Sequence, residues 1–221
     1  MVNIVLSSGG YDSTVLLAWC KNLWKDKKVE YYLYHCCLID DTVKSETSDF
    51  EIIFEIINEA ETKLFIENNN EPIINSKLHL LKENSYDDFG GEKRRSSYIP
   101  ARNSLLVLDA INKFYATHDK DEELTIFIGL IKTNPTFPDG NAEWLVKLND
   151  FLKVEFKGKV TVLAPFLDYD KDYVYKLGCS LGVDLNKTFS CNYEKDGKEC
   201  GKCGNCVWRK KHVYPNYRRL K

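Results

Sequence analysis

The chain has 221 residues, of which 43% are hydrophobic and 29% are charged, a balance typical of a folded protein that can bury a sizeable core. The net charge is -2, from 31 basic and 33 acidic residues, so no overall field favours nucleic acid or an anionic membrane, and we expect no nucleic-acid partner. The N-terminus enters an apolar run without a preceding basic segment, and no run approaches the ~18 apolar residues of a membrane span. We therefore expect a cytoplasmic protein without a membrane segment.

Apolar strand-like runs alternate with helical patterns through most of the chain, which predicts an α/β fold with a parallel sheet. In chain order, the predicted elements are a strand at 2–6, a helix at 13–24, a strand at 29–35, a long helix at 44–66, a short strand at 72–74, a mobile surface loop at 84–97, a helix at 102–117, a strand at 124–130, a helix at 141–152, a strand at 160–163 and a helix at 170–181. The long helix rests on apolar residues that recur close to a 3.6-residue period. The sequence beyond residue 189 has no periodicity.

A Ser-Gly-Gly-Tyr-Asp-Ser sequence lies between the predicted first strand and first helix, where an α/β sheet offers a ligand crevice. Gly9 and Gly10 allow the backbone to turn tightly and approach an anion, and the following helix offers unpaired N–H groups and a positive dipole end. Ser8 and Ser13 add hydroxyl donors, while Asp12 suits either a magnesium ion or a helix cap. The pattern predicts a phosphate site, and a capped helix after a glycine turn is the alternative.

Four of the eight cysteines crowd into a glycine-rich C-terminal stretch, at Cys191, Cys200, Cys203 and Cys206. Short Cys-x2-Cys steps let neighbouring thiolates reach one metal ion, and in a reducing cytosol such a set favours zinc over disulfides. Four thiolates close a tetrahedral site, so we predict a structural zinc, with an unmetallated or redox-active cluster as the alternative. We divide the chain into a nucleotide-binding catalytic domain at 1–186 and a C-terminal zinc segment at 187–221 packed on it. The sequence is compatible with a homodimer.

The loop at residues 8–13 resembles the SGGxDS loop of the PP-loop ATP pyrophosphatases, enzymes that cleave ATP between its α- and β-phosphates. Further segments resemble one family within that group, the 7-cyano-7-deazaguanine synthases (QueC). These segments are Tyr98-Ile99-Pro100-Ala101-Arg102-Asn103, similar to a (V/I)PGRN motif; Ala164-Pro165-Phe166-Leu167 with Asp170-Lys171, similar to an APL…K segment; and Thr188-Phe189-Ser190-Cys191 with the later cysteines and Arg209, similar to a TWSCY…CGxCxxC…R ending. The resemblance runs from residue 5 to about residue 212 and so covers nearly the whole chain.

The resemblance implies that ATP adenylates 7-carboxy-7-deazaguanine, that ammonia displaces AMP to form an amide, and that a second activation gives the nitrile. It implies ATP, Mg²⁺ and Zn²⁺ as cofactors. The catalytic residues that it implies are Asp12, Ser13, Arg102 and Lys171. Those that it implies for nucleotide binding are Ser8, Gly9, Gly10, Tyr11, Asp12, Ser13 and His35, and those for the substrate are Asp139, Arg102 and Asn103. Alternatives stay open for a surface Arg102, a Lys171 outside the site, a buried structural His35 and an Asp139 that caps the next helix.

The sequence departs from this family where a deazaguanine would be read. In the segment that usually reads like ETD-SGYPDCR-EF, Pro138-Asp139 and Glu143-Trp144 are kept, while the acidic stretch, the cysteine and the arginine are replaced. The region after the second strand also differs from the family's polar run. Three functions therefore stay open: a 7-cyano-7-deazaguanine synthase or an amide-forming variant, a QueC-like enzyme of an anti-phage system that adenylates a different carboxylate such as a protein terminus, and a non-catalytic nucleotide-binding or zinc-binding scaffold.

Overall fold

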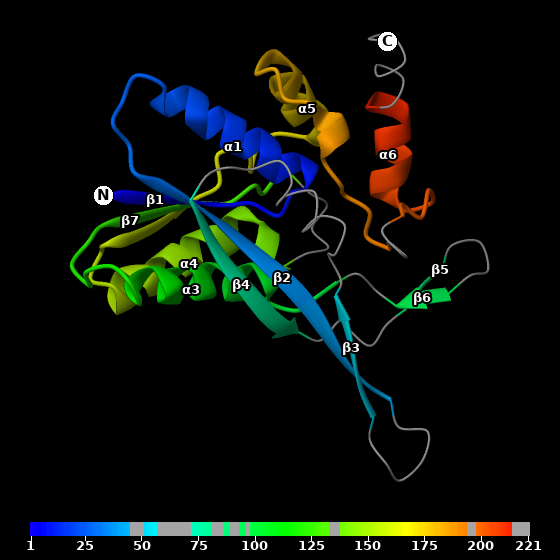
Figure 1. Cartoon of the computed structure of the whole chain (residues 1–221), viewed down its shortest axis with the longest axis horizontal. Helices are drawn as coiled ribbons and strands as arrows, with labels where there is room; N and C mark the ends of the chain where they lie inside the picture. The colour runs from blue at the N-terminus through cyan, green and yellow to red at the C-terminus, as the bar shows by residue number, and fades with distance from the viewer. Residues whose placement is uncertain are drawn as a thin grey trace.

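A six-stranded sheet lies at the centre of the computed structural model, which describes residues 1–44, 51–56, 72–80, 86–88, 93–95, 98–132, 138–193 and 198–213 (Figure 1). Its strands are β1 (Val2–Leu6), β2 (Tyr31–Lys44), β3 (Glu51–Ile56), β4 (Ile73–Leu80), β7 (Leu124–Phe127) and β8 (Val160–Leu163). Strand β1 pairs in parallel with β2 and β7, while β7 pairs in parallel with β8 and β2 with β4. The predicted α/β fold with a parallel sheet is confirmed.

Strand β2 is the longest strand and changes partners along its length. Leu33 and Tyr34 pair with β1 on one edge and with β4 on the other. Further along, Ile39 and Asp40 pair with β4 and with the antiparallel strand β3. Strand β4 occupies one edge of β2. On the other edge, β1 pairs with β2 only as far as Tyr34, and β3 pairs with the part of β2 that lies beyond.

This strand corrects the helix predicted at 44–66. Lys44 is the last residue of β2, and residues 51–56 form β3, while 45–50 and 57–66 lie outside the described residues. The apolar residues of β3 are isoleucines and a phenylalanine, which fit a pleated strand well. Their helical spacing is outweighed because the long edge of β2 offers them a backbone partner.

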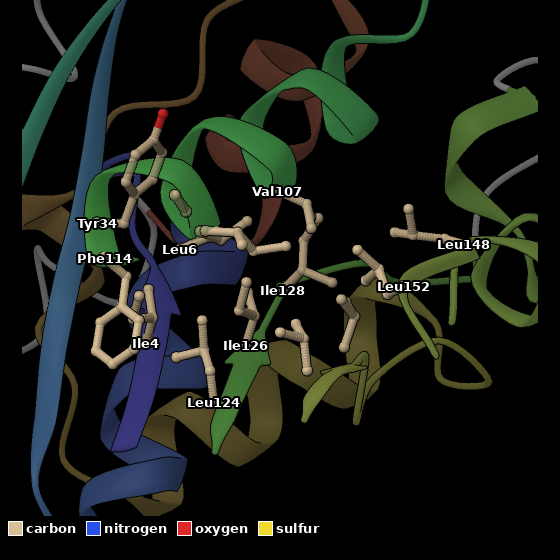
Figure 2. Packing of buried hydrophobic residues seen from close by; sticks show 14 of the residues in the cluster. Ile4, Leu6, Tyr34, Val107, Phe114, Leu124, Ile126, Ile128, Leu148 and Leu152 are labelled. Atoms are coloured by element: carbon tan, nitrogen blue, oxygen red, sulfur yellow. The ribbon is translucent and has the colours of Figure 1, made fainter. Parts of the chain in front are cut away.

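Helices cover both faces of the sheet (Figure 1). Helices α1 (Tyr11–Trp24) and α5 (Lys171–Ser180) lie on one face, and α3 (Arg102–Tyr115) and α4 (Ala142–Glu155) lie on the other. The alternation of side chains along β1 supplies both interfaces: Val5 packs among residues of α1 and α5, whereas Ile4 and Leu6 pack among residues of α3 and α4 (Figure 2). Every residue of β1 is buried, as expected for a strand covered on both faces. Within the described ranges, no helix is long and apolar enough to cross a bilayer.

The cysteine-rich part contains a helix that the sequence analysis missed, α6 (Gly204–His212), which follows the short turn η2 (Leu185–Lys187). Its buried Arg209, only 2% exposed, holds this helix to the chain before the cysteines. The guanidinium donates to Thr188 Oγ1 at 2.8 Å, to the carbonyl oxygen of Thr188 at 2.7 Å and to Glu199 Oε1 at 3.1 Å. The helix has nine residues and few buried positions, so it leaves little apolar period to detect.

Two smaller differences concern predicted ends and loops. Strand β4 extends well beyond the predicted 72–74 because it pairs with β2 along its whole length. The segment predicted as a loop at 84–97 contains two short antiparallel strands, β5 (Tyr86–Asp88) and β6 (Lys93–Arg95), and its other residues lie outside the described ranges. The strand predicted at 29–35 is found as β2, which ends nine residues later than predicted, and the remaining predicted strands and helices are found with ends that agree or differ by up to three residues.

Candidate functional site

A cavity of about 300 Å³ opens at the carboxyl ends of β1 and β7. It is lined by the turn from β1 into α1, by residues of β2, by the ends of β7 and the starts of α3, α5 and α6, and by neighbours of Cys191. The lining residues are Leu6, Ser7, Ser8, Gly10, Tyr11, Asp12, Ser13, Tyr34, Cys36, Arg102, Asn103, Leu106, Ile128, Gly129, Leu130, Lys171, Ser190, Asn192 and Asn205. The predicted phosphate turn therefore lies in the same cavity as residues from the far end of the chain.

The turn from β1 into α1 is held by its own serines. Gly9 has a φ of 87°, a left-handed conformation that favours glycine. Ser13 Oγ accepts from the N–H of Ser8 and donates to the carbonyl oxygen of Gly10, both at 3.2 Å. A Cβ on Gly129 would lie 3.2 Å from the backbone nitrogen of Ser13, so the missing side chain lets the chain after β7 approach α1 closely. The turn is thus fixed by protein contacts, which reduces the ordering cost of binding a ligand there.

Four helices begin at this cavity. Tyr11, Arg102 and Lys171 are the first residues of α1, α3 and α5, Asn205 is the second residue of α6, and all four line the cavity. Each helix N-terminus carries about half a positive charge, although some first-turn N–H groups already have protein partners: that of Tyr11 donates to Ser190 Oγ and that of Asn103 to Asp139 Oδ2. The side chains of Arg102 and Lys171 add two formal positive charges, whereas Asp12 is the single acidic residue among the lining residues. The cavity therefore suits a ligand with several negative charges.

Asp12 lies in the first turn of α1. Its Oδ1 is buried and has no hydrogen-bond partner among the described residues. Burial raises the pKa of this carboxyl group to about 6, and the nearby ammonium of Lys171 opposes that rise. Gly10 is the N-cap of α1, and no side chain caps this helix end, so Asp12 does not act as its cap. A buried carboxylate oxygen without a donor, at the predicted phosphate turn, is suited to a divalent cation.

Lys171 reaches the cavity from the start of α5. Its Nζ donates to Asn205 Oδ1 at 2.5 Å and lies 5.0 Å from the ring centre of Trp208 and 5.8 Å from that of Tyr11. Burial lowers the pKa of Lys171, and the carboxylate of Asp12 opposes this effect. An ammonium group has three N–H donors, so this lysine retains donors for a ligand beyond the bond to Asn205.

Arg102 and Asn103 line the cavity, whereas Asp139 does not. The buried Asp139 instead holds the start of α3: its Oδ2 accepts from the N–H of Asn103 at 2.8 Å, and its carbonyl oxygen accepts from Asn103 Nδ2 at 2.7 Å. The cap of α4 is Asn141, whose Oδ1 accepts from the N–H of Trp144 at 2.9 Å. The alternative that Asp139 caps this helix is therefore wrong.

Gly9 and His35, which the resemblance implied for nucleotide binding, are not among the lining residues. The carbonyl oxygen of Gly9 accepts from the N–H of Phe189 at 3.2 Å. His35 is buried, and its Nδ1 lies 2.9 Å from the carbonyl oxygen of Ser7. Burial lowers the pKa of His35, which favours its neutral form. Gly9 thus joins the predicted phosphate turn to the C-terminal part of the chain, and His35 contacts the residue that precedes the turn.

The four C-terminal cysteines form a compact cluster in which all sulfur atoms lie within 4.8 Å of one another. A tetrahedral zinc with Zn–S bonds of 2.3 Å places its sulfurs about 3.8 Å apart, which this cluster matches closely. The backbone N–H groups of Cys200 and Tyr193 donate to Cys191 Sγ at 3.2 and 3.4 Å, and the N–H of Cys203 donates to Cys200 Sγ at 3.3 Å. Such donors stabilise thiolates. The donor set fits a single soft metal ion.

Several lining residues were missed from the sequence. Ser190 and Asn192 flank Cys191, and Asn205 precedes Cys206, so the cysteine spacing marked these positions without indicating that they reach the cavity. Tyr34 and Cys36 come from β2, and Tyr34 donates from its hydroxyl to Asp109 Oδ2 at 2.7 Å. No local pattern distinguishes these residues from ordinary polar or core positions.

Comparisons with known proteins agree over almost the whole chain. The family model described as Queuosine biosynthesis protein QueC matches residues 2–216. A 7-cyano-7-deazaguanine synthase from Pyrococcus furiosus is 28% identical over 220 residues, which cover 94% of this chain and 90% of that protein. The 7-cyano-7-deazaguanine synthase of Methanocaldococcus jannaschii is 28% identical over 225 residues, covering 96% and 94%.

Among solved structures, the U34-tRNA thiolase NcsA from Methanococcus maripaludis, with its 4Fe-4S cluster, aligns at 16% identity over 99% of this chain and 71% of that chain. Its TM-score of 0.39 is too low to support an inference about fold or cofactor.

Proposed function

The chain belongs to the QueC family of queuosine biosynthesis proteins, and from that premise we propose that it is an ATP-dependent, adenylate-forming ligase of the 7-cyano-7-deazaguanine synthase type. One observation carries this proposal: four helix N-termini and the side chains of Arg102 and Lys171 meet around a preformed glycine turn. Such an arrangement suits the triphosphate of ATP better than a neutral ligand.

The reaction makes a carboxylate reactive towards ammonia. A carboxylate oxygen of the acceptor attacks the α-phosphorus of ATP, the bond from that phosphorus to the bridging oxygen breaks, and pyrophosphate leaves. Ammonia then attacks the acyl carbon and loses a proton, and AMP departs to leave an amide. The amide oxygen then attacks the α-phosphorus of a second ATP, which releases a second pyrophosphate, and one N–H proton is lost. Elimination of AMP, which carries that oxygen away, together with the other N–H proton gives the nitrile.

In this scheme the turn at residues 8–13 holds the outer phosphates, and its serines keep the turn rigid. Lys171 and Arg102 donate to phosphate oxygens and stabilise the charge that develops on the leaving pyrophosphate. Asn103, beside Arg102 at the start of α3, lines the same cavity, and we assign it to the acceptor.

Two metal ions are part of the proposal. Asp12 Oδ1 is the atom that we assign to Mg²⁺, which would neutralise phosphate charge when bound. Cys191, Cys200, Cys203 and Cys206 are the residues that we assign to a structural Zn²⁺.

A second candidate is an enzyme of the same mechanism that adenylates a different carboxylate, such as a protein terminus. The observation in its favour is that the Asp139 carboxylate is bonded to the backbone of Asn103 and lies outside the cavity lining. We take this contact to favour an acceptor other than a guanine-like base.

Measuring pyrophosphate release from ATP in the presence of Mg²⁺ distinguishes these candidates. Release that requires 7-carboxy-7-deazaguanine, with ammonia consumed, supports the synthase. Release that ignores this acid but requires a peptide carboxylate supports the second candidate. A protein that binds ATP yet releases no pyrophosphate with any acceptor would be a nucleotide-binding scaffold, and the proposal would be wrong.

A further inference from the structure

We propose that Asn205 is a positioning residue that holds the Lys171 ammonium group away from Asp12 and towards the phosphate turn. This inference rests on the proposed function and adds a role for the cysteine-rich segment in it. Asn205 lies between Cys203 and Cys206 at the start of α6, so the segment that carries the metal ligands also supplies the partner of a phosphate-site lysine.

The contacts of Asn205 form a short chain. Its Oδ1 accepts from Lys171 Nζ at 2.5 Å, and its Nδ2 donates to Asn192 Oδ1 at 2.9 Å. Asn192 follows Cys191, so both asparagines are adjacent to cysteines of the cluster, and both line the cavity. The amide group of Asn205 is thereby oriented with its oxygen towards the lysine and its nitrogen towards Asn192.

The surrounding framework is fixed by further contacts between α5 and α6. The Tyr175 hydroxyl donates to the carbonyl oxygen of His212 at 2.8 Å, and Trp208 Nε1 donates to Asp172 Oδ1 at 3.0 Å. The chain beside Cys191 also touches α1, because Ser190 Oγ accepts from the N–H of Tyr11 at 3.2 Å. The segment that carries Asn205 is therefore held by contacts to α5 and to the start of α1.

Without the Asn205 amide, the ammonium group of Lys171 has two kinds of neighbour left, aromatic rings and the Asp12 carboxylate. The rings are those of Trp208 and Tyr11, whose faces accept no conventional hydrogen bond. The Asp12 carboxylate is the single opposite charge among the lining residues, and it already acts on Lys171 through its field. We expect the freed ammonium to turn to Asp12, which would occupy the side chains that phosphate and a cation need.

Binding of α,β-methylene-ATP with Mg²⁺, measured by calorimetry on the full chain, tests the inference. The variant Asn205→Ala should bind about 10-fold more weakly than the wild type, as expected for loss of a charge-assisted hydrogen bond. In a Lys171→Ala background the same substitution should have little further effect, because the asparagine acts through the lysine. The exposed Asn186→Ala, outside the cavity lining, is the matched control and should bind as the wild type does.

The outcomes separate the inference from the proposed function. A wild-type protein that does not bind the analogue overturns both. Wild-type binding with an unchanged Asn205→Ala variant overturns the inference alone, as do equal losses from Asn205→Ala in the presence and absence of Lys171. Metal content and thermal midpoint are measured on each variant, and loss of the metal from Asn205→Ala would assign the residue to the cluster rather than to the lysine.

Discussion

At the scale of single residues, Asp12 combines a cost in stability with the proposed role in binding Mg²⁺. Its Oδ1 is buried without a partner, and burial raises the pKa of the carboxyl group from 3.8 to about 6. Because the pKa is higher in the folded state, the unfolded chain releases this proton first as pH rises. The penalty on folding is therefore absent below about pH 4 and complete above about pH 6.

The variant Asp12→Asn should remove this penalty together with the function. Without nucleotide or Mg²⁺, we expect it to be more stable than the wild type by about 3 kcal/mol at pH 7, but by less than about 1 kcal/mol at pH 4. Urea unfolding at the two pH values measures this difference, and pyrophosphate release at pH 7 should be lost. The control Asp168→Asn removes a carboxylate exposed to solvent, so its effect should be small at both pH values. An equal gain from Asp12→Asn at pH 4 would contradict the assigned cause.

Residues of the site were predictable where the chemistry is encoded locally. The turn with Gly9 and the cluster around Cys203 stand in short patterns whose residue types allow few other uses. The position of Asp139 beside Asn103 depends on how α3 meets the turn before α4, 36 residues further along the chain. No local pattern contains that contact, so the sequence alone does not indicate it.

At the scale of elements, Arg209 determines how firmly α6 is held. Its guanidinium is 2% exposed and bonds to Thr188 and Glu199, which precede the helix. Replacement by alanine leaves these acceptors without a donor and should destabilise the protein by about 3 kcal/mol. Thermal unfolding measures the loss, and faster release of the metal to a chelator should accompany it.

The control for this prediction is Lys210→Ala, the exposed neighbour of Arg209 on the same helix. It removes a positive charge from α6 without touching the buried network, so we expect a change within about 0.5 kcal/mol. Similar losses from both variants would mean that the overall charge of α6, rather than the contacts of Arg209, stabilises this part of the chain.

Elements were predictable where apolar periodicity and the fold require the same structure. Strand β1 is buried on both faces and helix α3 has one buried stripe, so their apolar residues predict a strand and a helix without knowledge of the neighbouring elements. The apolar residues of β3 do not, because they suit either a helix or a strand and the free edge of β2 decides between them. That edge exists only once β2 extends past β1, which is a property of the sheet rather than of the segment.

At the scale of the whole molecule, the two ends of the chain build one cavity. The N-terminal turn around Gly9 bonds to Phe189, and the first residue of α1 bonds to Ser190. The first cysteine of the cluster, Cys191, follows directly, so the cluster lies next to the chain that contacts the predicted phosphate turn. Occupancy of the cluster and occupancy of the cavity should therefore be coupled, and such coupling acts equally in both directions.

Metal removal tests this coupling. After chelation, the protein should bind α,β-methylene-ATP and Mg²⁺ roughly 10-fold more weakly, and Zn²⁺ should restore the affinity. Reciprocity then requires that the analogue slows or reduces metal loss to a chromogenic chelator, with Mg²⁺ in excess in both samples. The variant Asn205→Ala keeps the four cysteines but lacks the contact to Lys171, so it should retain its metal while the analogue protects that metal less. If the analogue bound equally well with and without the metal, the cluster would stabilise the C-terminal part alone, and the adjoining chain would transmit nothing between the two sites.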